Sequence, residues 1–155
     1  MLTNYDLDAP PGTSNEVIRL ARRLLVITAK SAYAVRALAE LARRGGSPVP
    51  IAEVAARRDI SPQFLESLFV TLRRGGVLQS QRGVKGGYSL ARPAESISVL
   101  EVVELLEGEV GAGAAALGSP WAEIAEQVRA ALSATTVADV AQREAQQAGA
   151  AMYYI

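Results

Sequence analysis

The segment VLQSQRGVKGGYSLA at 77–91 constrains the fold of this 155-residue chain more than any other stretch. Its apolar residues alternate with period two on both sides of a glycine-rich turn, which predicts two strands, 77–81 and 88–91. The turn is too long for a two-residue hairpin. We therefore expect a longer β-ribbon that carries Arg82 and Lys85 at its tip, with glycines that let its backbone approach another surface closely.

An amphipathic helix is predicted directly before the ribbon, between Ser61-Pro62 and Gly75-Gly76. Serine is a favoured N-cap because its oxygen accepts from free amides, and proline fits the first helical turn. Apolar residues recur at i, i+3, i+4 and i+7, at Leu65, Leu68, Phe69 and Leu72. The opposite face is polar and carries Gln63, Glu66, Ser67, Thr71 and Arg74.

Further helices are predicted on both sides of this helix–ribbon unit. Two precede it, at 28–44 and 51–58, and three follow it, at 98–107, 119–132 and 136–147. Ser98 and Glu101 form a capping box, in which the serine oxygen and the glutamate carboxylate each satisfy an amide. The alanine- and glycine-rich stretch 108–118 is expected to be a flexible link.

Composition narrows the possible functions. The chain has neither cysteine nor histidine, so it lacks thiolate ligands and the commonest metal ligand and general base. There is no long apolar run for a membrane span and no secretory signal, so we expect a cytoplasmic protein that does not bind membranes. The net charge of zero hides a division: residues 24–92 have eleven Lys and Arg against four Asp and Glu, and residues 93–155 have two against nine. This asymmetry favours contact with a polyanion, although chance patterning of solvated charges is the alternative.

Three helices followed by a two-stranded ribbon predict a winged helix-turn-helix. Its third helix is slim enough to enter the DNA major groove, about 12 Å wide, and its polar face can bond to base edges. The glycines and cations of the ribbon suit the sugar-phosphate wall, and Arg82 could instead enter the minor groove. The expected partner is therefore double-stranded DNA.

The helix at 119–132 carries an apolar stripe that includes Trp121, Ile124, Val128 and Leu132. A single short helix cannot bury such a face alone, so it either folds back on the winged helix or pairs with a second copy. Pairing is favoured because two-fold DNA sites suit two-fold proteins, which makes these four residues the expected dimerisation contacts.

The expected fold class is thus mainly α with a small β-wing, a winged helix-turn-helix followed by C-terminal dimerisation helices. We expect a flexible N-terminal extension at 1–25, a DNA-binding domain at 26–95, and a helical dimerisation and regulatory region at 96–155.

Three ordered strings carry a family resemblance: ITAKSAYAVRALAELA, PVPIAEVAARRDISPQFLESLFVTLRRGGVLQSQRGVKGGYSLARP and ISVLEVVELLEG. Together they resemble the Rrf2-type bacterial transcription regulators, the group of the iron–sulfur and cysteine-metabolism repressors. The resemblance covers residues 26–155. It implies a homodimer in which each chain supplies a winged helix-turn-helix and a long helix that crosses its twin.

The resemblance also implies DNA-binding positions. On the recognition helix it places Ser61, Gln63, Phe64, Glu66 and Ser67. On the wing it places Arg82, Gly83 and Lys85, and beside the DNA backbone it places Lys30 and Tyr33. Two interpretations stay open for Phe64, core packing or contact with a thymine methyl, and Glu66 and Ser67 are either plain surface or base contacts.

Many of these relatives hold an iron–sulfur cluster with three cysteines in the link that corresponds to 109–120 here. This link, EVGAGAAALGSP, has no cysteine, so cluster binding through thiolates is excluded, and we expect no cofactor and no metal site. The link and the tail MYYI are more similar to the cluster-free, cysteine-metabolism branch. There the family implies a repressor whose signal arrives through a small-molecule effector or a partner enzyme of cysteine metabolism.

Two other functions are weighed against DNA binding. A winged helix can serve as a protein–protein interaction module without binding DNA, but such a module need not be basic on its third helix and ribbon. An enzyme without His and Cys would need a carboxylate pair or a lysine. The acidic residues Glu101, Glu104, Glu107 and Glu109 are expected on a solvated helix edge without partner cations, so we expect no catalysis.

Overall fold

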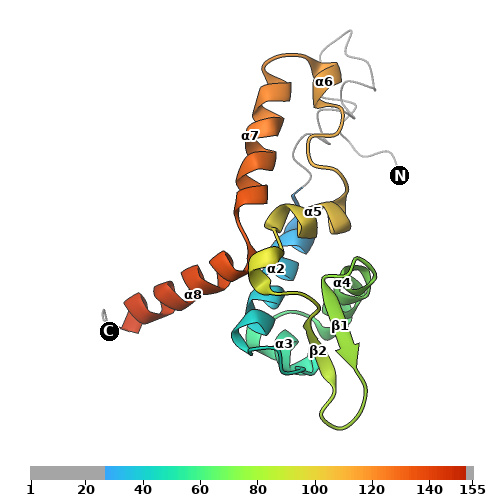
Figure 1. The fold of residues 1–155 in the computed structure, drawn as a ribbon, viewed down its shortest axis with the longest axis vertical. Coiled ribbons are helices and arrows are strands. Elements are labelled where there is room, and N and C mark those ends of the chain that lie inside the picture. The colour runs from blue at the N-terminus through green and yellow to red at the C-terminus, as the bar shows by residue number, and fades with distance from the viewer. Residues whose placement is uncertain (1–26, 153–155) are drawn as a thin grey trace.

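The computed structural model describes residues 27–152 (Figure 1). The predicted extension at 1–25 lies outside the described residues. Within them the elements follow in the order α2 (Ala29–Arg43), α3 (Ile51–Arg58), α4 (Pro62–Arg74), β1 (Leu78–Gln81), β2 (Gly87–Leu90), the 3-10 turn η2 (Ala94–Ser96), α5 (Val99–Glu107), α6 (Ala114–Leu117), α7 (Trp121–Ala134) and α8 (Val137–Met152). This order confirms the mainly α fold with a small β-wing.

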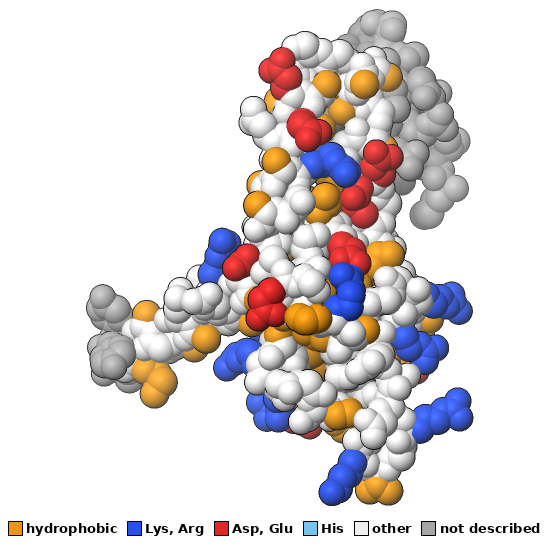
Figure 2. Space-filling view, viewed as in Figure 1, with side chains coloured by type: hydrophobic (Ala, Val, Ile, Leu, Met, Phe, Trp, Pro, Cys, Tyr) orange, Lys and Arg blue, Asp and Glu red, His pale blue; other side chains and the backbone are white. Residues whose placement is uncertain are grey.

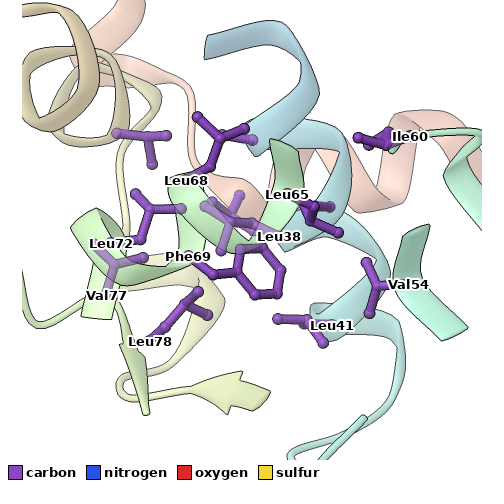
Figure 3. Packing of buried hydrophobic residues seen from close by; sticks show 14 of the residues in the cluster. Leu38, Leu41, Val54, Ile60, Leu65, Leu68, Phe69, Leu72, Val77 and Leu78 are labelled. Carbon is purple, nitrogen blue, oxygen red and sulfur yellow. The ribbon is translucent and has the colours of Figure 1, made fainter. Parts of the chain in front are cut away.

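The core lies between α2, α3, α4 and the base of the ribbon (Figure 3). The predicted apolar stripe of α4 is buried in full, and Phe69 lies at its centre with its side chain inaccessible to solvent. The Phe69 ring meets the Tyr88 ring edge to face, at 4.9 Å between centroids, so the core also fixes the second strand. Leu38 and Leu41 of α2 close the other side of this core.

The two strands pair antiparallel, from Leu78 opposite Leu90 to Gln81 opposite Gly87. Val49 pairs with β2 on the side away from β1. The Val49 amide donates to the Tyr88 carbonyl oxygen at 2.9 Å, and the Val49 carbonyl oxygen accepts from the Tyr88 amide at 2.8 Å. Gly87 permits this approach, because a Cβ there would overlap the Val49 backbone. Both strands lie within one residue of the predicted ranges.

Two predicted capping interactions are wrong in part. Ser61 precedes α4, but its side chain makes no capping hydrogen bond. Ser98 accepts from the Glu101 amide at 3.1 Å as expected, whereas the Glu101 carboxylate pairs with Arg92 instead of reaching back to the Ser98 amide. A charge-assisted bond to a guanidinium is stronger than a bond to a neutral amide, which accounts for the exchange.

The C-terminal part departs most from the sequence prediction. The segment 108–118, expected to be a flexible link, contains the short helix α6. Two of its residues, Val110 before α6 and Ala114 at the start of α6, are buried. The last helix continues to Met152, beyond the predicted end at 147, and runs through Gly149. A glycine inside a helix costs only about 1 kcal/mol relative to alanine, so the flanking alanines and glutamines maintain the helix. Figure 1 shows α6 and α7 projecting from the core side by side, while α8 leaves α7 at an angle.

None of the described helices has both the length and the apolar character that a bilayer crossing requires.

Candidate nucleic-acid interface

The outer face of α4 is an open polar surface. Gln63, Glu66 and Ser67 are all exposed there, as is Ser61 just before the helix. The Ser67 hydroxyl donates to the Phe64 carbonyl oxygen at 2.7 Å, so its proton is engaged within the helix and its oxygen is left to accept. The face therefore offers an amide, a carboxylate and hydroxyl acceptors to an external partner.

For Phe64 the structure shows core packing, one of the two roles that the sequence left open. Its side chain is half-buried and packs against the core, and its ring meets the Tyr33 ring edge to face at 5.9 Å between centroids. Because Tyr33 lies in the first turns of α2, this pair joins the start of α4 to the start of α2. Lys30, one turn earlier on α2, is exposed beside it.

The ribbon presents its cations at a defined tip. Arg82, Gly83 and Lys85 are exposed, and the Gly86 amide donates to the Gly83 carbonyl oxygen at 2.9 Å to close the turn. Within the ribbon, the Ser80 hydroxyl of β1 accepts from the Arg73 guanidinium of α4 at 3.2 Å. Helix α4 and the ribbon are thus linked directly as well as through the core.

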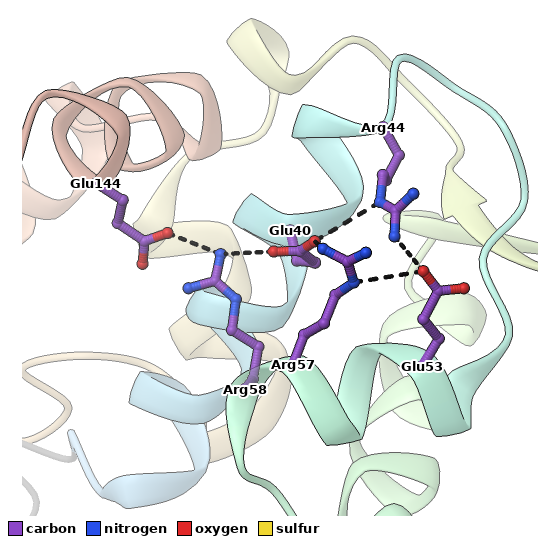
Figure 4. Close-up of polar contacts among 6 residues, drawn as sticks. All are labelled: Glu40, Arg44, Glu53, Arg57, Arg58 and Glu144. Carbon is purple, nitrogen blue, oxygen red and sulfur yellow. Dashed lines mark hydrogen bonds and ion pairs between the residues drawn. The ribbon is translucent and has the colours of Figure 1, made fainter. Parts of the chain in front are cut away.

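Several arginines in the basic half of the sequence are paired with acidic side chains in a network (Figure 4). Glu40 of α2, whose side chain is only 8% exposed, forms an ion pair with Arg58 at 3.2 Å and lies 3.6 Å from both Arg44 and Arg57. Arg58 also bonds to Glu144 of α8 at 2.8 Å. The network therefore ties α2, α3 and α8 together. Its local pairs could be found from i, i+4 spacing, but the link to Glu144 could not.

Seven cations on α2, α4 and the ribbon have no acidic partner among the described residues. No salt bridge to another described residue is made by Lys30, Arg36, Arg43, Arg73, Arg74, Arg82 or Lys85. Figure 2 shows Lys and Arg around the lower part of the molecule, over α4 and the ribbon, while Asp and Glu lie around α5 and α7. The division of charge along the sequence is therefore also a division in space.

The expectation that the acids of α5 lack partners is wrong. Glu101 pairs with Arg92, and Glu104 pairs with Arg129 at 2.8 Å. Those bonds raise the pKa of Arg92 and of Arg129 further above ordinary arginine, so both stay charged. These acids are thus structural, and the partners were missed because Arg129 is distant in sequence.

Glu107 at the end of α5 is tied to the start of α2. Its carboxylate accepts from the Thr28 amide at 3.1 Å, from the Thr28 hydroxyl, and from the Ser31 hydroxyl at 3.0 Å. Burial raises the pKa of Glu107, but these hydrogen bonds outweigh burial and hold the pKa below its ordinary value of 4.5. The ionised carboxylate therefore fastens α5 to the turn that precedes Lys30.

The predicted dimerisation residues share one side of α7. Trp121 is 45% exposed and Ile124 is 37% exposed, whereas Val128 and Leu132 are half-buried. Ala125, which belongs to the same stripe, packs against Ala114 of α6. The large apolar residues at the α6 end of the helix are thus left uncovered within one chain.

An iron–sulfur cluster does not fit the residues between α5 and α7. The whole sequence has no cysteine or histidine, and Val110 and Ala114 fill this segment with apolar side chains. Across residues 27–152, no group of three or more His, Cys, Asp or Glu side chains could hold a metal ion.

Comparisons with known proteins agree with this geometry. The family model Rrf2, described as an iron-dependent transcriptional regulator, matches residues 27–143. The regulator IscR of Cereibacter sphaeroides is 49% identical over 98 residues, which are 59% of this chain and 63% of that protein. The chain therefore spans less than two thirds of the length of this relative. The Mycobacterium tuberculosis protein Rv1287 is 36% identical over 129 residues, or 74% of this chain and 80% of that protein.

Solved structures show the same likeness. IscR of T. potens aligns with a TM-score of 0.68 at 33% identity and covers 80% of this chain and 90% of its own. CymR of B. subtilis, the global cysteine regulator of that organism, aligns with a TM-score of 0.69 at 29% identity and covers 77% of this chain and 98% of its own. IscR and CymR are regulators and not enzymes, in keeping with the expected lack of catalysis. Because the fold is a winged helix-turn-helix and the family model matches three quarters of the sequence, this chain belongs to the Rrf2 family of transcriptional regulators.

Proposed function

We propose that this protein is a homodimeric, sequence-specific DNA-binding repressor that works without an iron–sulfur cluster. One observation carries the proposal: the exposed polar face of α4 adjoins the cationic ribbon, while the inner face of α4 is held in the core. Such a surface suits duplex DNA, because base edges lie in the major groove and phosphates line its walls.

The roles follow from the chemistry of each side chain. Gln63, Glu66 and Ser67 would contact base edges, where an amide pairs with adenine and a carboxylate accepts from cytosine. Ser61 and Phe64 would lie at the entry of the helix into the groove, and Phe64 offers apolar surface to a thymine methyl. Arg82, Gly83 and Lys85 would meet the sugar-phosphate wall or the minor groove beside it. Lys30 and Tyr33 would contact the backbone on the other side of α4.

Dimerisation is supported by the uncovered residues of α7. Trp121 and Ile124 form the exposed end of a stripe that continues into Val128 and Leu132. A second copy crossing α7 would cover the stripe and present two recognition helices to one duplex. Half-sites would then lie roughly 34–36 Å apart, or closer in a compressed variant.

The absence of cysteine supports a signal that is not an iron–sulfur cluster. We propose instead a small-molecule effector or a partner enzyme of cysteine metabolism, by analogy with CymR, the cysteine regulator of B. subtilis. The signal would act by changing the spacing of the two winged helices, as a population shift between two arrangements. We place this activity in the cytoplasm.

The decisive experiment is selection of bound sequences from a random DNA pool, followed by measurement of affinity against salt. An enriched inverted repeat and a steep negative slope of log affinity against log salt are expected. A slope near zero together with no enrichment would leave the protein-docking winged helix as the better function.

Single substitutions then test which wing residues contact DNA. Arg82→Ala should weaken binding by about 1–3 kcal/mol if the guanidinium reads a base or a narrow groove. Lys85→Ala should weaken binding to all sequences alike and make the salt slope shallower by about one unit. Unchanged binding in both variants would show that the wing does not touch DNA.

A further inference from the structure

The tip of the ribbon is a closed turn that presents a valine outward. Gly83 and Gly86 are joined by the hydrogen bond that closes the turn, so Val84 and Lys85 occupy its two corners. The Val84 side chain is 105% exposed, which means that no other described residue covers it. A Cβ at Gly86 would overlap the Gln81 carbonyl oxygen, so the backbone itself fixes the shape of this turn.

A valine is an unusual choice for this corner. Turn positions favour Gly, Pro, Asn, Asp and Ser, which have a local conformational reason to be there. A β-branched apolar side chain gains nothing from the turn and, at this site, nothing from packing. Single exposed apolar residues are common on protein surfaces, but Val84 lies at the end of the ribbon between the exposed cations Arg82 and Lys85.

The ribbon has the length to bring this corner to a second DNA groove. Each strand has four residues, and at about 3.3 Å per residue the ribbon spans about 13 Å. The major groove is about 12 Å wide. The bond from Arg73 to Ser80, the third residue of β1, holds the ribbon against α4. With α4 in the major groove, the tip would therefore pass one phosphate wall and meet the adjacent minor groove.

We propose that Val84 is a specificity-determining residue that favours A·T over G·C pairs in the minor groove beneath the ribbon tip. The proposal rests on the DNA-binding function proposed above. In the minor groove both A·T orientations show only acceptors, whereas G·C adds the guanine N2 amino group. The valine methyls cover base acceptors in either pair, but over G·C they would also cover the amino group without accepting from it and leave an additional donor unpaired. Arg82 acts in the same direction, since narrow A-tract grooves attract arginine.

The test uses the duplex enriched from a random pool by the full-length protein, with three versions of the pair under the tip. These are A·T, G·C and inosine·C, which keeps the major-groove edge of G·C but lacks the N2 amino group. Fluorescence anisotropy at one fixed salt concentration measures each affinity. We expect A·T and inosine·C to bind alike and G·C to bind about 5- to 20-fold more weakly, within the usual range for one mismatched pair.

Two matched variants separate the valine from its neighbours. Val84→Asn supplies an oxygen that accepts from the amino group, so its preference should fall below about twofold. Val84→Ile stays apolar and should keep the preference. Both variants should unfold at the wild-type temperature, because this side chain has no packing contacts to lose.

Each contrary result has a distinct meaning. Failure of the wild-type protein to bind any of the three duplexes would overturn the proposed function itself. Binding with inosine·C as weak as G·C would place the discrimination in the major groove and overturn the role of Val84. A preference that survives in Val84→Asn but disappears in Arg82→Ala would assign it to the arginine, and Val84 would again lose its role.

Discussion

The winged helix and the projecting arm, residues 108–134, are held together by different forces. The winged helix surrounds a large apolar cluster that includes Leu38, Leu65, Phe69 and Leu72. The arm has only a small cluster, Ala114 against Ala125, with Val110 buried close by in the sequence. Polar bonds tie it to α5: the Glu104 carboxylate accepts from Arg129 at 2.8 Å and from the Val110 amide at 3.1 Å.

This difference predicts that the two regions depend on different interactions for their stability. Buried apolar area dominates folding free energy, so the winged helix contains enough of a core to be stable in one chain. The arm buries little and leaves Trp121 and Ile124 exposed. We therefore expect the winged helix to depend on its own packing, and the arm to depend on a second copy.

The largest effect should come from emptying the core of the winged helix. Phe69→Ala removes a ring that is completely buried, and we expect unfolding free energy to fall by about 3–5 kcal/mol. Chemical denaturation followed by circular dichroism measures it. The exposed control Gln63→Ala on the same helix should stay within about 0.5 kcal/mol of wild type. Equal losses in both variants would contradict the described core.

The next effect should appear in the arm and should depend on protein concentration. Trp121→Ala should weaken dimerisation by about 2–4 kcal/mol, as for a central aromatic contact, while the winged helix stays folded. Analytical ultracentrifugation over a concentration series measures the dimer, with exposed Gln127→Ala as the control. A Trp121→Ala protein that remains a dimer at wild-type affinity would refute the proposed interface.

The ion-pair network joins the winged helix to α8. Substitutions in it measure how much these ion pairs add to the stability that the apolar core provides. Glu40→Gln keeps the shape of the side chain but removes the charge that Arg58 contacts at 3.2 Å. We expect a loss of about 1.5–3 kcal/mol in unfolding free energy, typical of hydrogen bonds to charged groups. Thermal unfolding of Glu40→Gln beside Glu144→Gln, which removes a single pair, should show the larger loss for Glu40. The reverse order would place the centre of the network on α8.

The smallest effect should be the pH dependence contributed by Glu107. A carboxyl whose pKa is lowered in the folded chain stabilises that chain above the unfolded value near 4.5. This stabilisation, about 0.2–1 kcal/mol, should disappear as pH falls through the lowered pKa. Glu107→Gln should therefore flatten the stability curve below pH 4.5, whereas exposed Glu123→Gln should not. Stability measured by urea denaturation from pH 6 to pH 3 checks the difference.

The elements of the winged helix could be predicted because local signals and packing agreed there. The stripe from Leu65 to Leu72 predicted both the helix and its buried face, and the glycines near Gly87 predicted the ribbon turn. The arm could not be predicted in this way, because alanine and glycine repeats in 108–118 carry no apolar period. Its order comes from the bonds of Arg129, which is remote in sequence.

The candidate site also has a part that the sequence predicted and a part that it could not. The sequence predicted Gln63, Glu66 and Ser67 on the outer face of α4, and the structure places them exposed there. It could not predict that Arg58 turns toward Glu40 and Glu144, because both acids come from other helices. Opposite charges pair when the fold brings them within reach, whatever their separation along the chain.

By itself the sequence determined the order of helices and strands, the buried face of α4 and the cations of the ribbon, because each depends on residues within one or two turns of one another. Only the tertiary structure decided which arginines stay free for a partner, how 108–118 is ordered and where α5 attaches to α2. Those outcomes depend on groups such as Glu107 and Thr28 that meet only after the chain has folded.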